Sequence, residues 1–328
     1  MAKKKGDTLN ERARAVTERM RGEAKRIGVL KTQADCGATI LDAGISAPGS
    51  YEAGRLFTLA CMADTADVRF EAVFLNDFSV PYVSVFANDP VGGCMAAQYA
   101  GWAINLKLAE GAYFAMGSGP ARALYAKEAI FADIGRTEKS DVAVIALETR
   151  MYPPEAVLLH IADCCGVKPE NLTVLLAPTA SLVGCVQVSA RIVETGMHKL
   201  HELGFDLSHV LSACGCAPIP PVAPNDGIAI GWTNDAILYG GSAWYTVSCE
   251  DEELTAVLEK LPACASPDYG TPFYQLLKRY DWDFYKIDPL LFSPAVVTIN
   301  NKKTGKTYRV GEKNQPLLEE QWLAVNGG

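Results

Sequence analysis

The sequence has no run of about 18 apolar residues, which is the length that a membrane-spanning helix needs. It is also poor in basic residues, because 30 Lys and Arg stand against 38 Asp and Glu, for a formal net charge of −8. Nucleic-acid-binding surfaces are usually basic, so we expect neither a nucleic-acid nor a membrane partner. The N-terminal lysines Lys3–Lys5 are not followed by an apolar segment, which argues against a secretory signal and predicts a cytoplasmic protein.

The sequence lacks the motifs that usually hold a metal or a dinucleotide. It contains no CxxC, no HExxH and no complete GxGxxG pattern. Ten cysteines are present, but the close pairs Cys164–Cys165 and Cys214–Cys216 do not have the spacing of a zinc or redox motif. His198 and His201 come nearest to a ligand pair, yet no third ligand follows at a suitable spacing. We therefore expect reduced cysteines, no metal and no NAD or other cofactor.

The 328 residues, 49% of them hydrophobic, are enough for one large or two ordinary domains. Helical and β-type runs do not alternate regularly, and the tail around Lys303–Lys306 resembles a hairpin, which favours an α+β fold over a doubly wound sheet. We expect two α+β subdomains facing across a substrate pocket, at residues 1–135 and 136–328, whose segments can interleave. Helices are expected at 9–28 (with Asn10 as N-cap), 51–62, 91–98, 154–165, 181–203 and 251–261, and strands at 69–75, 82–88, 113–116 and 141–147.

The expected helix at 181–203 carries polar side chains on one face. Arg191, Glu194, His198 and His201 recur at steps of three and four, beside a stripe of apolar residues. An arginine one turn away favours the ionised form of a carboxylate, and an ionised carboxylate can orient and deprotonate a water molecule. The alternative is a surface ion pair between helix neighbours, which stabilises the helix by about a few tenths of a kcal/mol. Spacing alone favours this alternative.

A short glycine loop, Gly117–Pro120, lies between the strand expected at 113–116 and a helix expected from Ala121. Backbone amides at such a helix start can bind a phosphate or carboxylate, and Arg122 in the first turn would add positive charge. The alternative is a tight strand-to-helix turn that binds nothing. On the residues alone, the two interpretations are equally supported.

Five segments resemble methenyltetrahydromethanopterin cyclohydrolase, lie in the same order as in that family, and cover most of residues 35–242. The segments are DCGATILDAGISAPGSYEAG (35–54), QYAGW (98–102), YFAMGSGPARAL (113–124), SARIVETGMHKLHELGFD (189–206) and TNDAILYGG (233–241). Several motifs in register are far more specific than any one of them. The resemblance implies an α+β fold of two subdomains facing across a pocket, a homotrimer, and a pterin substrate.

The resemblance also implies an activity, the reversible hydrolysis of N5,N10-methenyltetrahydromethanopterin to the N5-formyl derivative in one-carbon metabolism. In the family, an arginine and a glutamate three residues apart carry the hydrolysis, and Arg191 and Glu194 match them. Glu194 would be the general base and Arg191 its positioning partner, without a metal or redox cofactor. Two alternatives from other classes are a pterin-binding protein without turnover and an unrelated phosphate-sugar enzyme that uses the Gly117 loop.

The resemblance favours substrate binding by further residues of the matched segments, including the loop residues Gly117, Ser118, Gly119 and Arg122. Asn234 and Asp235 would bind the amide edge of the pterin, or else form an Asx turn. Lys107 is a candidate charge at the site, although an exposed strand lysine is the default. The family usually has a basic residue where this chain has Trp232, so an anion contact is either lost there or replaced by aromatic packing. In the 42–54 segment, a helix-capping role for Ser50 is favoured over a ligand contact.

Overall fold

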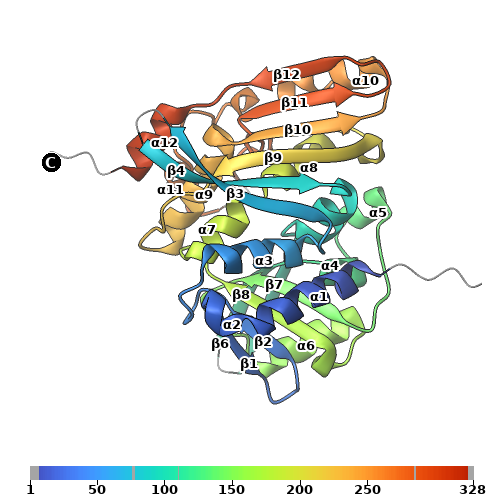
Figure 1. Cartoon of the computed structure of the whole chain (residues 1–328), viewed down its shortest axis with the longest axis vertical. Helices are drawn as coiled ribbons and strands as arrows, with labels where there is room; N and C mark the ends of the chain where they lie inside the picture. The colour runs from blue at the N-terminus through green and yellow to red at the C-terminus, as the bar shows by residue number, and fades with distance from the viewer. Residues whose placement is uncertain (1–6, 76–77, 110, 284–285, 324–328) are drawn as a thin grey trace, which may run out of the picture. The chain divides into compact units, whose positions relative to one another are not determined.

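The computed structural model describes residues 7–75, 78–109, 111–283 and 286–323. These residues form two compact units, and each unit combines a six-stranded sheet with helices (Figure 1). The first unit consists of Met1–Ala66 and Gly92–Gly184, and the second of Asp67–Val91 and Cys185–Gly328. The expected α+β fold of two subdomains is confirmed.

The division between the units does not follow the expected boundary after residue 135. The strands β3 (Ala66–Leu75) and β4 (Phe78–Ala87) belong to the second unit, because β4 pairs antiparallel with β9 (Val210–Pro218). This pairing joins segments that are far apart in the sequence, and local patterns do not reveal it. The two units therefore interleave along the chain.

The sheet of the first unit has the strand order β1-β2-β8-β7-β6-β5. Its strands are β1 (Leu30–Gln33), β2 (Thr39–Asp42), β5 (Trp102–Leu108), β6 (Gly111–Ser118), β7 (Ala143–Glu148) and β8 (Leu172–Ala177). Its helical segments are α1 (Leu9–Gly22), α2 (Ala24–Ile27), α3 (Tyr51–Cys61), the π-helix η1 (Val91–Gln98), α4 (Ala121–Tyr125), α5 (Ile130–Ile134), α6 (Glu155–Cys165) and η2 (Pro169–Asn171).

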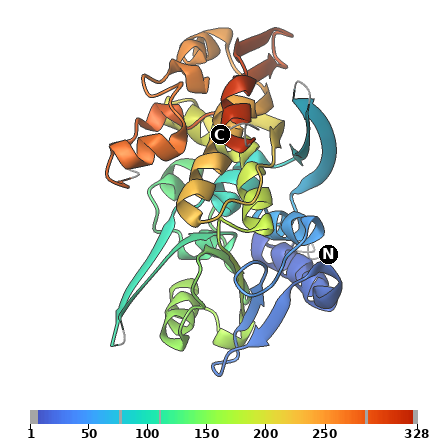
Figure 2. The ribbon, with the colours of Figure 1, turned by 90° about the vertical axis from the view of Figure 1, so that its left-hand side faces the viewer.

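The core of the first unit lies on both faces of the central strands. β8 is buried at every position, as expected for a central strand covered on both faces. On β7, Ile145 and Leu147 pack with Val157 and Ile161 of α6. The helices α1 and α3 contact β7 as well and pack against each other. Figure 2 shows β5 and β6 as a long hairpin that extends away from this packed centre.

The sheet of the second unit has the order β12-β11-β10-β9-β4-β3. Besides β3, β4 and β9 it contains β10 (Ser242–Val247), β11 (Val296–Asn301) and β12 (Thr307–Gly311). The helical segments are α8 (Ile192–Glu202), η3 (Leu207–His209), α9 (Asp226–Gly240), α10 (Asp251–Thr255), η4 (Leu258–Lys260), η5 (Ala263–Ala265), α11 (Phe273–Arg279), η7 (Pro289–Leu291) and α12 (Gln315–Trp322). The helix α7 (Leu182–Ser189) crosses the division between the units. The predicted terminal hairpin is confirmed, because β11 and β12 pair antiparallel.

Capping interactions explain where two helices begin. Ser50 caps α3 by accepting a hydrogen bond from the Ala53 amide, as predicted. The N-cap of α1 is Thr8, which forms a capping box with Glu11, so the prediction of Asn10 was wrong. Asn10 is buried instead, because its side chain donates to the Pro120 carbonyl and accepts from the Val144 amide.

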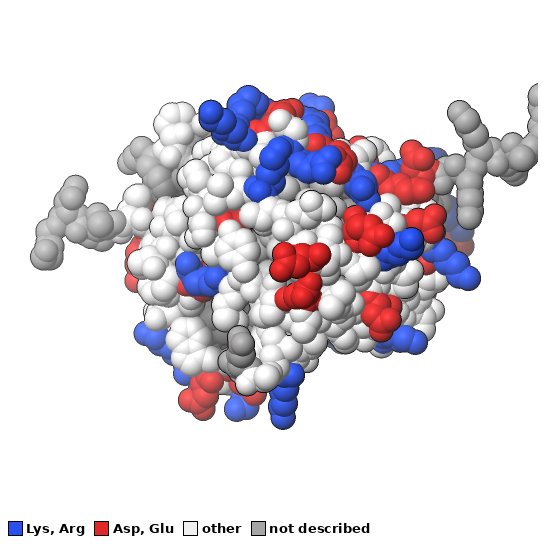
Figure 3. Space-filling model, turned by 90° about the horizontal axis from the view of Figure 1, so that it is seen from below, with Lys and Arg blue, Asp and Glu red and all other residues white. Residues whose placement is uncertain are grey.

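Two further expectations need correction. The helix expected at 251–261 ends at Thr255, and a 3-10 turn, η4, follows it. The segment expected as an α-helix at 91–98 is a π-helix. Within the described residues, no helix is both long and apolar enough to cross a membrane. On the face shown in Figure 3, acidic and basic side chains intermingle between uncharged areas.

Candidate functional site

The helix predicted at 181–203 is interrupted immediately before the candidate catalytic pair. α7 ends at Ser189 and α8 begins at Ile192, with Arg191 as N-cap residue at φ −78° and ψ 4°. At the break, the Arg191 amide donates to the Val188 carbonyl three residues back, rather than four. The Arg191 carbonyl then accepts from both the amide and the hydroxyl of Thr195, which starts the new helix. The prediction of one continuous helix was wrong at this point.

Arg191 and Glu194 nevertheless lie together at the start of α8. Arg191 Nη1 is 3.6 Å from Glu194 Oε2, and Arg191 Nη2 donates to Gln187 Oε1 at 3.1 Å. The two charged side chains are only 11% and 7% exposed, respectively. An ordinary helix-surface ion pair is well exposed to solvent, so this degree of burial favours a functional or core role over the surface alternative.

Close packing against the sheet fixes the start of α8. Ile192 rests against Gly215 of β9 and Gly241, where a Cβ atom would come within 3.1 Å and 2.4 Å of the Ile192 side chain. One turn later, Gly196 leaves room for Tyr245, whose hydroxyl donates to the Val193 carbonyl at 2.9 Å. A Cβ at Gly196 would lie 2.0 Å from that hydroxyl oxygen. These contacts hold the backbone that carries Arg191 and Glu194.

The two histidines of the predicted polar face lie toward the other end of α8. His198 Nε2 is 3.6 Å from Glu202 Oε1, and His201 Nδ1 is 3.8 Å from the same oxygen. Glu202 is thus a common partner for both rings. The predicted polar face therefore divides into a buried Arg191–Glu194 part and a more exposed part around Glu202.

The structure encloses Arg122 completely. Its guanidinium donates to both carboxylate oxygens of Glu128, at 2.9 and 2.6 Å, and to the carbonyls of Met95 and Ala97. The rings of Tyr99 and Phe131 lie within 5.0 and 5.3 Å of the guanidinium carbon. Since its donors have partners and its side chain is 0% exposed, these contacts favour a structural role.

The rest of the glycine loop is similarly engaged. Ser118 is buried, and its hydroxyl donates to the Gln98 carbonyl at 2.6 Å. Gly119 adopts φ +101° and would place a Cβ 3.1 Å from the Val144 carbonyl oxygen. At Gly117, a Cβ would lie 3.0 Å from the Trp102 carbonyl oxygen. The glycines are thus required by close backbone packing, which supports the tight-turn interpretation.

The remaining candidate substrate-binding residues lie in elements of different units. Lys107 is an exposed residue on β5 of the first unit. Asn234 and Asp235 lie inside α9 of the second unit rather than in an Asx turn, and Asn234 donates to the Ile230 carbonyl. Asp235 accepts from the Phe273 amide at 2.9 Å and is wholly buried. This burial raises the pKa of Asp235 to about 8, so the carboxyl is largely protonated at neutral pH.

Two sets of contacts, those of Gln187 and those of Asp42, were not predicted from the sequence. Gln187 lies four residues before Arg191, and this helical spacing was the available signal for its contact. Asp42 organises the glycine-rich segment after β2 by accepting from the amides of residues 44–47 and from the Tyr152 hydroxyl. Burial acts to raise the pKa of Asp42, but these hydrogen bonds lower it overall. Tyr152 lies far along the chain, so local sequence gave no sign of this contact.

Comparison with known proteins shows the family to which this chain belongs. The model of the family described as "Cyclohydrolase (MCH)" matches residues 8–322. The chain belongs to this cyclohydrolase family. Three similar proteins each carry the name methenyltetrahydromethanopterin cyclohydrolase. The protein of Methanocaldococcus jannaschii is 42% identical over 95% of this chain and 97% of its own length. The protein of Methylobacillus flagellatus is 41% identical over 96% of this chain and 95% of its own length. The protein of Methanospirillum hungatei is 44% identical over 94% of this chain and 96% of its own length.

The cyclohydrolase family match extends across both units, from the first turn of α1 to the end of α12. Arg191 and Glu194, which the resemblance had identified, are therefore inside the matched region of this family member. They form the one candidate catalytic pair that the structure brings into contact in the described residues.

Proposed function

We propose that this protein is a hydrolase that converts N5,N10-methenyltetrahydromethanopterin to N5-formyltetrahydromethanopterin, in a reversible reaction. The family match over residues 8–322 carries this conclusion, together with the names of relatives about two-fifths identical along almost the whole chain. A pterin-binding protein without turnover, or a phosphate-sugar enzyme that uses the Gly117 loop, is less well supported. The contacts of Ser118 and Arg122 leave that loop without a free cation.

The chemistry requires a positioned base rather than an elaborate catalytic apparatus. The bridging carbon of the substrate is electrophilic because two nitrogens share one positive charge. A water oxygen bonds to this carbon while Glu194 accepts a proton from the water. The bond from the carbon to N10 then breaks, N10 takes a proton, and the hydroxyl oxygen becomes the formyl carbonyl as it loses its own. The net reaction consumes one water and releases one proton.

Arg191 is proposed to position Glu194 and to favour its ionised form. The 3.6 Å contact between their side chains supports this role, and so does the hydrogen bond that ties the guanidinium to Gln187. An ionised base held in one orientation is pre-organised for the transition state, so little reorientation is needed when the water attacks. No step in this scheme uses a metal, NAD or another cofactor.

Two further features are proposed from the family resemblance, a cytoplasmic location and a homotrimeric assembly. Light scattering on the purified protein at micromolar concentration tests the assembly, and a stable monomer would contradict it.

The activity itself is tested by following the absorbance of the methenyl chromophore. Purified protein should abolish the chromophore of methenyltetrahydromethanopterin much faster than buffer does, with methenyltetrahydrofolate assayed in parallel to define the pterin class. Stoichiometric binding without loss of the chromophore would indicate the non-catalytic alternative, and absence of binding would contradict both.

A further inference from the structure

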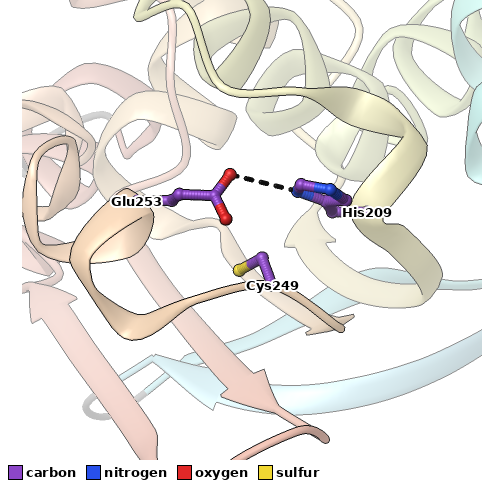
Figure 4. Close-up of side chains that lie close together, drawn as sticks. All are labelled: His209, Cys249 and Glu253. Atoms are coloured by element: carbon purple, nitrogen blue, oxygen red, sulfur yellow. Dashed lines mark ion pairs between the residues drawn. The ribbon is translucent and has the colours of Figure 1, made fainter.

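Three side chains that are typical metal ligands converge in the second unit. His209 ends η3, Cys249 follows β10, and Glu253 lies in α10. One potential ligand atom from each residue lies within 4.8 Å of the other two. Figure 4 shows the carboxylate of Glu253 facing the imidazole of His209, with the sulfur of Cys249 beside the carboxylate.

We propose that His209, Cys249 and Glu253 bind one Zn²⁺ ion per chain. Imidazole, thiolate and carboxylate are the three ligand types that zinc takes in proteins, and a set of three leaves a fourth position for water. A thiolate and an imidazole disfavour magnesium and calcium, which prefer oxygen ligands. This proposal departs from the expectation of no metal, which rested on motifs of closely spaced residues, whereas His209 and Cys249 lie far apart in the chain.

The spacing of the ligand atoms suits a tetrahedral ion. His209 Nδ1 and Glu253 Oε2 are 3.3 Å apart. Two ligands at about 2.0 Å from zinc, separated by the tetrahedral angle, lie about 3.3 Å from each other. The same geometry puts a sulfur at about 2.3 Å from the metal and about 3.5 Å from the nitrogen. Since the three ligand atoms lie within 4.8 Å of one another, closure around an ion needs a shift of about 1.3 Å at most.

In the described part of the chain, the Nδ1 atom of His209 is a buried polar atom whose one ion-pair contact is with Glu253. Its Nδ1 atom is inaccessible to solvent and has no hydrogen bond in the described part of the chain, although Glu253 Oε2 is close. A buried polar atom without a hydrogen bond is uncommon, and coordination of an ion would satisfy it. The edge-on ring of Phe205, 6.0 Å from the imidazole, packs beside it.

Hydrogen bonds hold each ligand segment in place. The Ser248 amide donates to the His209 carbonyl at 3.0 Å, which ties the segment before Cys249 to η3. Asn301 is fully buried and brackets Cys249, because its Nδ2 donates to the Cys249 carbonyl while its Oδ1 faces the Cys249 amide.

The carboxylate of Glu253 is oriented in the same way. Its Oε1 accepts from the Glu250 amide at 3.0 Å in the capping box of α10, which leaves Oε2 directed at His209. Such outer contacts orient metal ligands and are part of a typical metal site. An ion here would join η3, the segment after β10 and α10, and would stabilise the second unit by an amount that grows with the logarithm of the zinc concentration above Kd.

The test uses the full chain after chelator treatment and dialysis, with Co²⁺ as a spectroscopic probe and Zn²⁺ as competitor. We expect one Co²⁺ per chain with a sulfur-to-metal charge-transfer band, displacement of that band by Zn²⁺, and a rise in Tm on addition of Zn²⁺. Cys249→Ser should abolish the band and weaken Zn²⁺ binding by about 100-fold or more, since even outer contacts are worth 10 to 100-fold.

Two further variants make the result decisive. Cys264→Ser, which removes an exposed cysteine, should leave the band and the Zn²⁺ affinity unchanged. Glu253→Gln retains the size of the side chain and should remove most of the Tm increase caused by Zn²⁺. The proposal is overturned if the wild-type protein shows no such band, or if Cys249→Ser retains it. Turnover of the pterin should be equal with and without Zn²⁺, so this outcome is independent of the proposed catalytic role of Glu194.

Discussion

Glu194 Oε2 lies 3.6 Å from Arg191 Nη1 across the first turn of α8, and both side chains are almost excluded from solvent. A buried carboxylate that loses its cation is left uncompensated, which makes the pair sensitive to any change in either member. The same burial and the contact with Arg191 restrict the orientation of the carboxylate, so a water molecule bound beside it would face an oriented base. The pair thus provides direct tests of the proposed mechanism.

Replacement of Glu194 by Gln should abolish most of the turnover. The amide has the same size but cannot accept a proton from water, so we expect kcat to fall by roughly 10² to 10⁴, with KM little changed. Stopped-flow loss of the methenyl chromophore measures this. Glu202→Gln at the exposed end of α8 is the matched control and should retain normal kcat. Near-normal kcat in Glu194→Gln would mean that another carboxylate activates the water.

Replacement of Arg191 by Lys should also impair catalysis. Lysine keeps the charge but lacks the planar fork that contacts Gln187 and Glu194 together. The double variant Arg191→Lys, Glu194→Gln should cost much less in kcat than the sum of the single effects, because the two residues act as a unit. Strict additivity of the two free-energy changes would show that Arg191 and Glu194 act independently.

Replacement of Arg122 by Ala should mainly destabilise the protein. It leaves Glu128 as a largely buried charge without its cation, at a cost of about 3–5 kcal/mol in unfolding free energy. Urea unfolding measures this loss, and KM should stay unchanged at temperatures where the variant remains folded. The sequence-based expectation that Arg122 anchors the substrate predicts instead a raised KM with kcat less affected, so steady-state kinetics distinguishes the two roles.

The free energy of unfolding should fall as the pH rises from the ordinary pKa of Asp235 to its raised pKa in the folded protein. Its ordinary pKa is 3.8, and burial raises the folded-state value to about 8. Between these values the folded protein retains a proton that the unfolded chain has lost, so the unfolding free energy decreases with increasing pH. Asp235→Asn cannot ionise and should show a smaller decline of Tm between pH 5 and pH 8.5. An equal decline in both proteins would contradict the buried, protonated state.

A fifth test concerns the contact that holds α8 on the sheet. Gly196→Ala places a methyl group against the Tyr245 hydroxyl and disrupts its hydrogen bond to the Val193 carbonyl. We expect a loss of about 1–3 kcal/mol in stability from overpacking, and a lower kcat because Glu194 shifts with the helix. Tyr245→Phe makes room beside Gly196→Ala by removing the hydroxyl, and the double variant should recover part of both losses. Wild-type kcat in Gly196→Ala would show that the start of α8 tolerates displacement.

Local patterns in the sequence predicted many elements but not their connections. The strands around 69–75, 82–88 and 141–147 and the terminal hairpin were recognisable, because β-branched and aromatic runs depend on near neighbours. The break before Arg191 was missed, because apolar spacing continues through it. There, tertiary packing of Ile192 against Gly215 of β9 and against Gly241 overrides the local helical pattern.

The candidate site was predictable only where its residues are close in sequence. Arg191 and Glu194 lie one helical turn apart, and the family resemblance identified them. The burial of Arg122 depends on carbonyls of Met95 and Ala97 in another segment, and that of Asp235 on α11. Contacts of this kind arise from the fold, and neither the residue type nor its neighbours predict them.

The insertion of β3 and β4 into the sheet of the second unit also constrains the order of events during synthesis. The ribosome releases β4 long before β9, the strand that pairs with it. Until then, Val83 and Val85, both buried in the finished fold, lack their cover, and the edge of β4 exposes unpaired backbone groups. The first unit can complete its own sheet once β8 has emerged, while the second must wait for almost the whole chain. The nascent protein therefore carries an unprotected strand edge from the release of β4 until the release of β9, more than a third of the chain later, which makes this hairpin a target for a chaperone during synthesis.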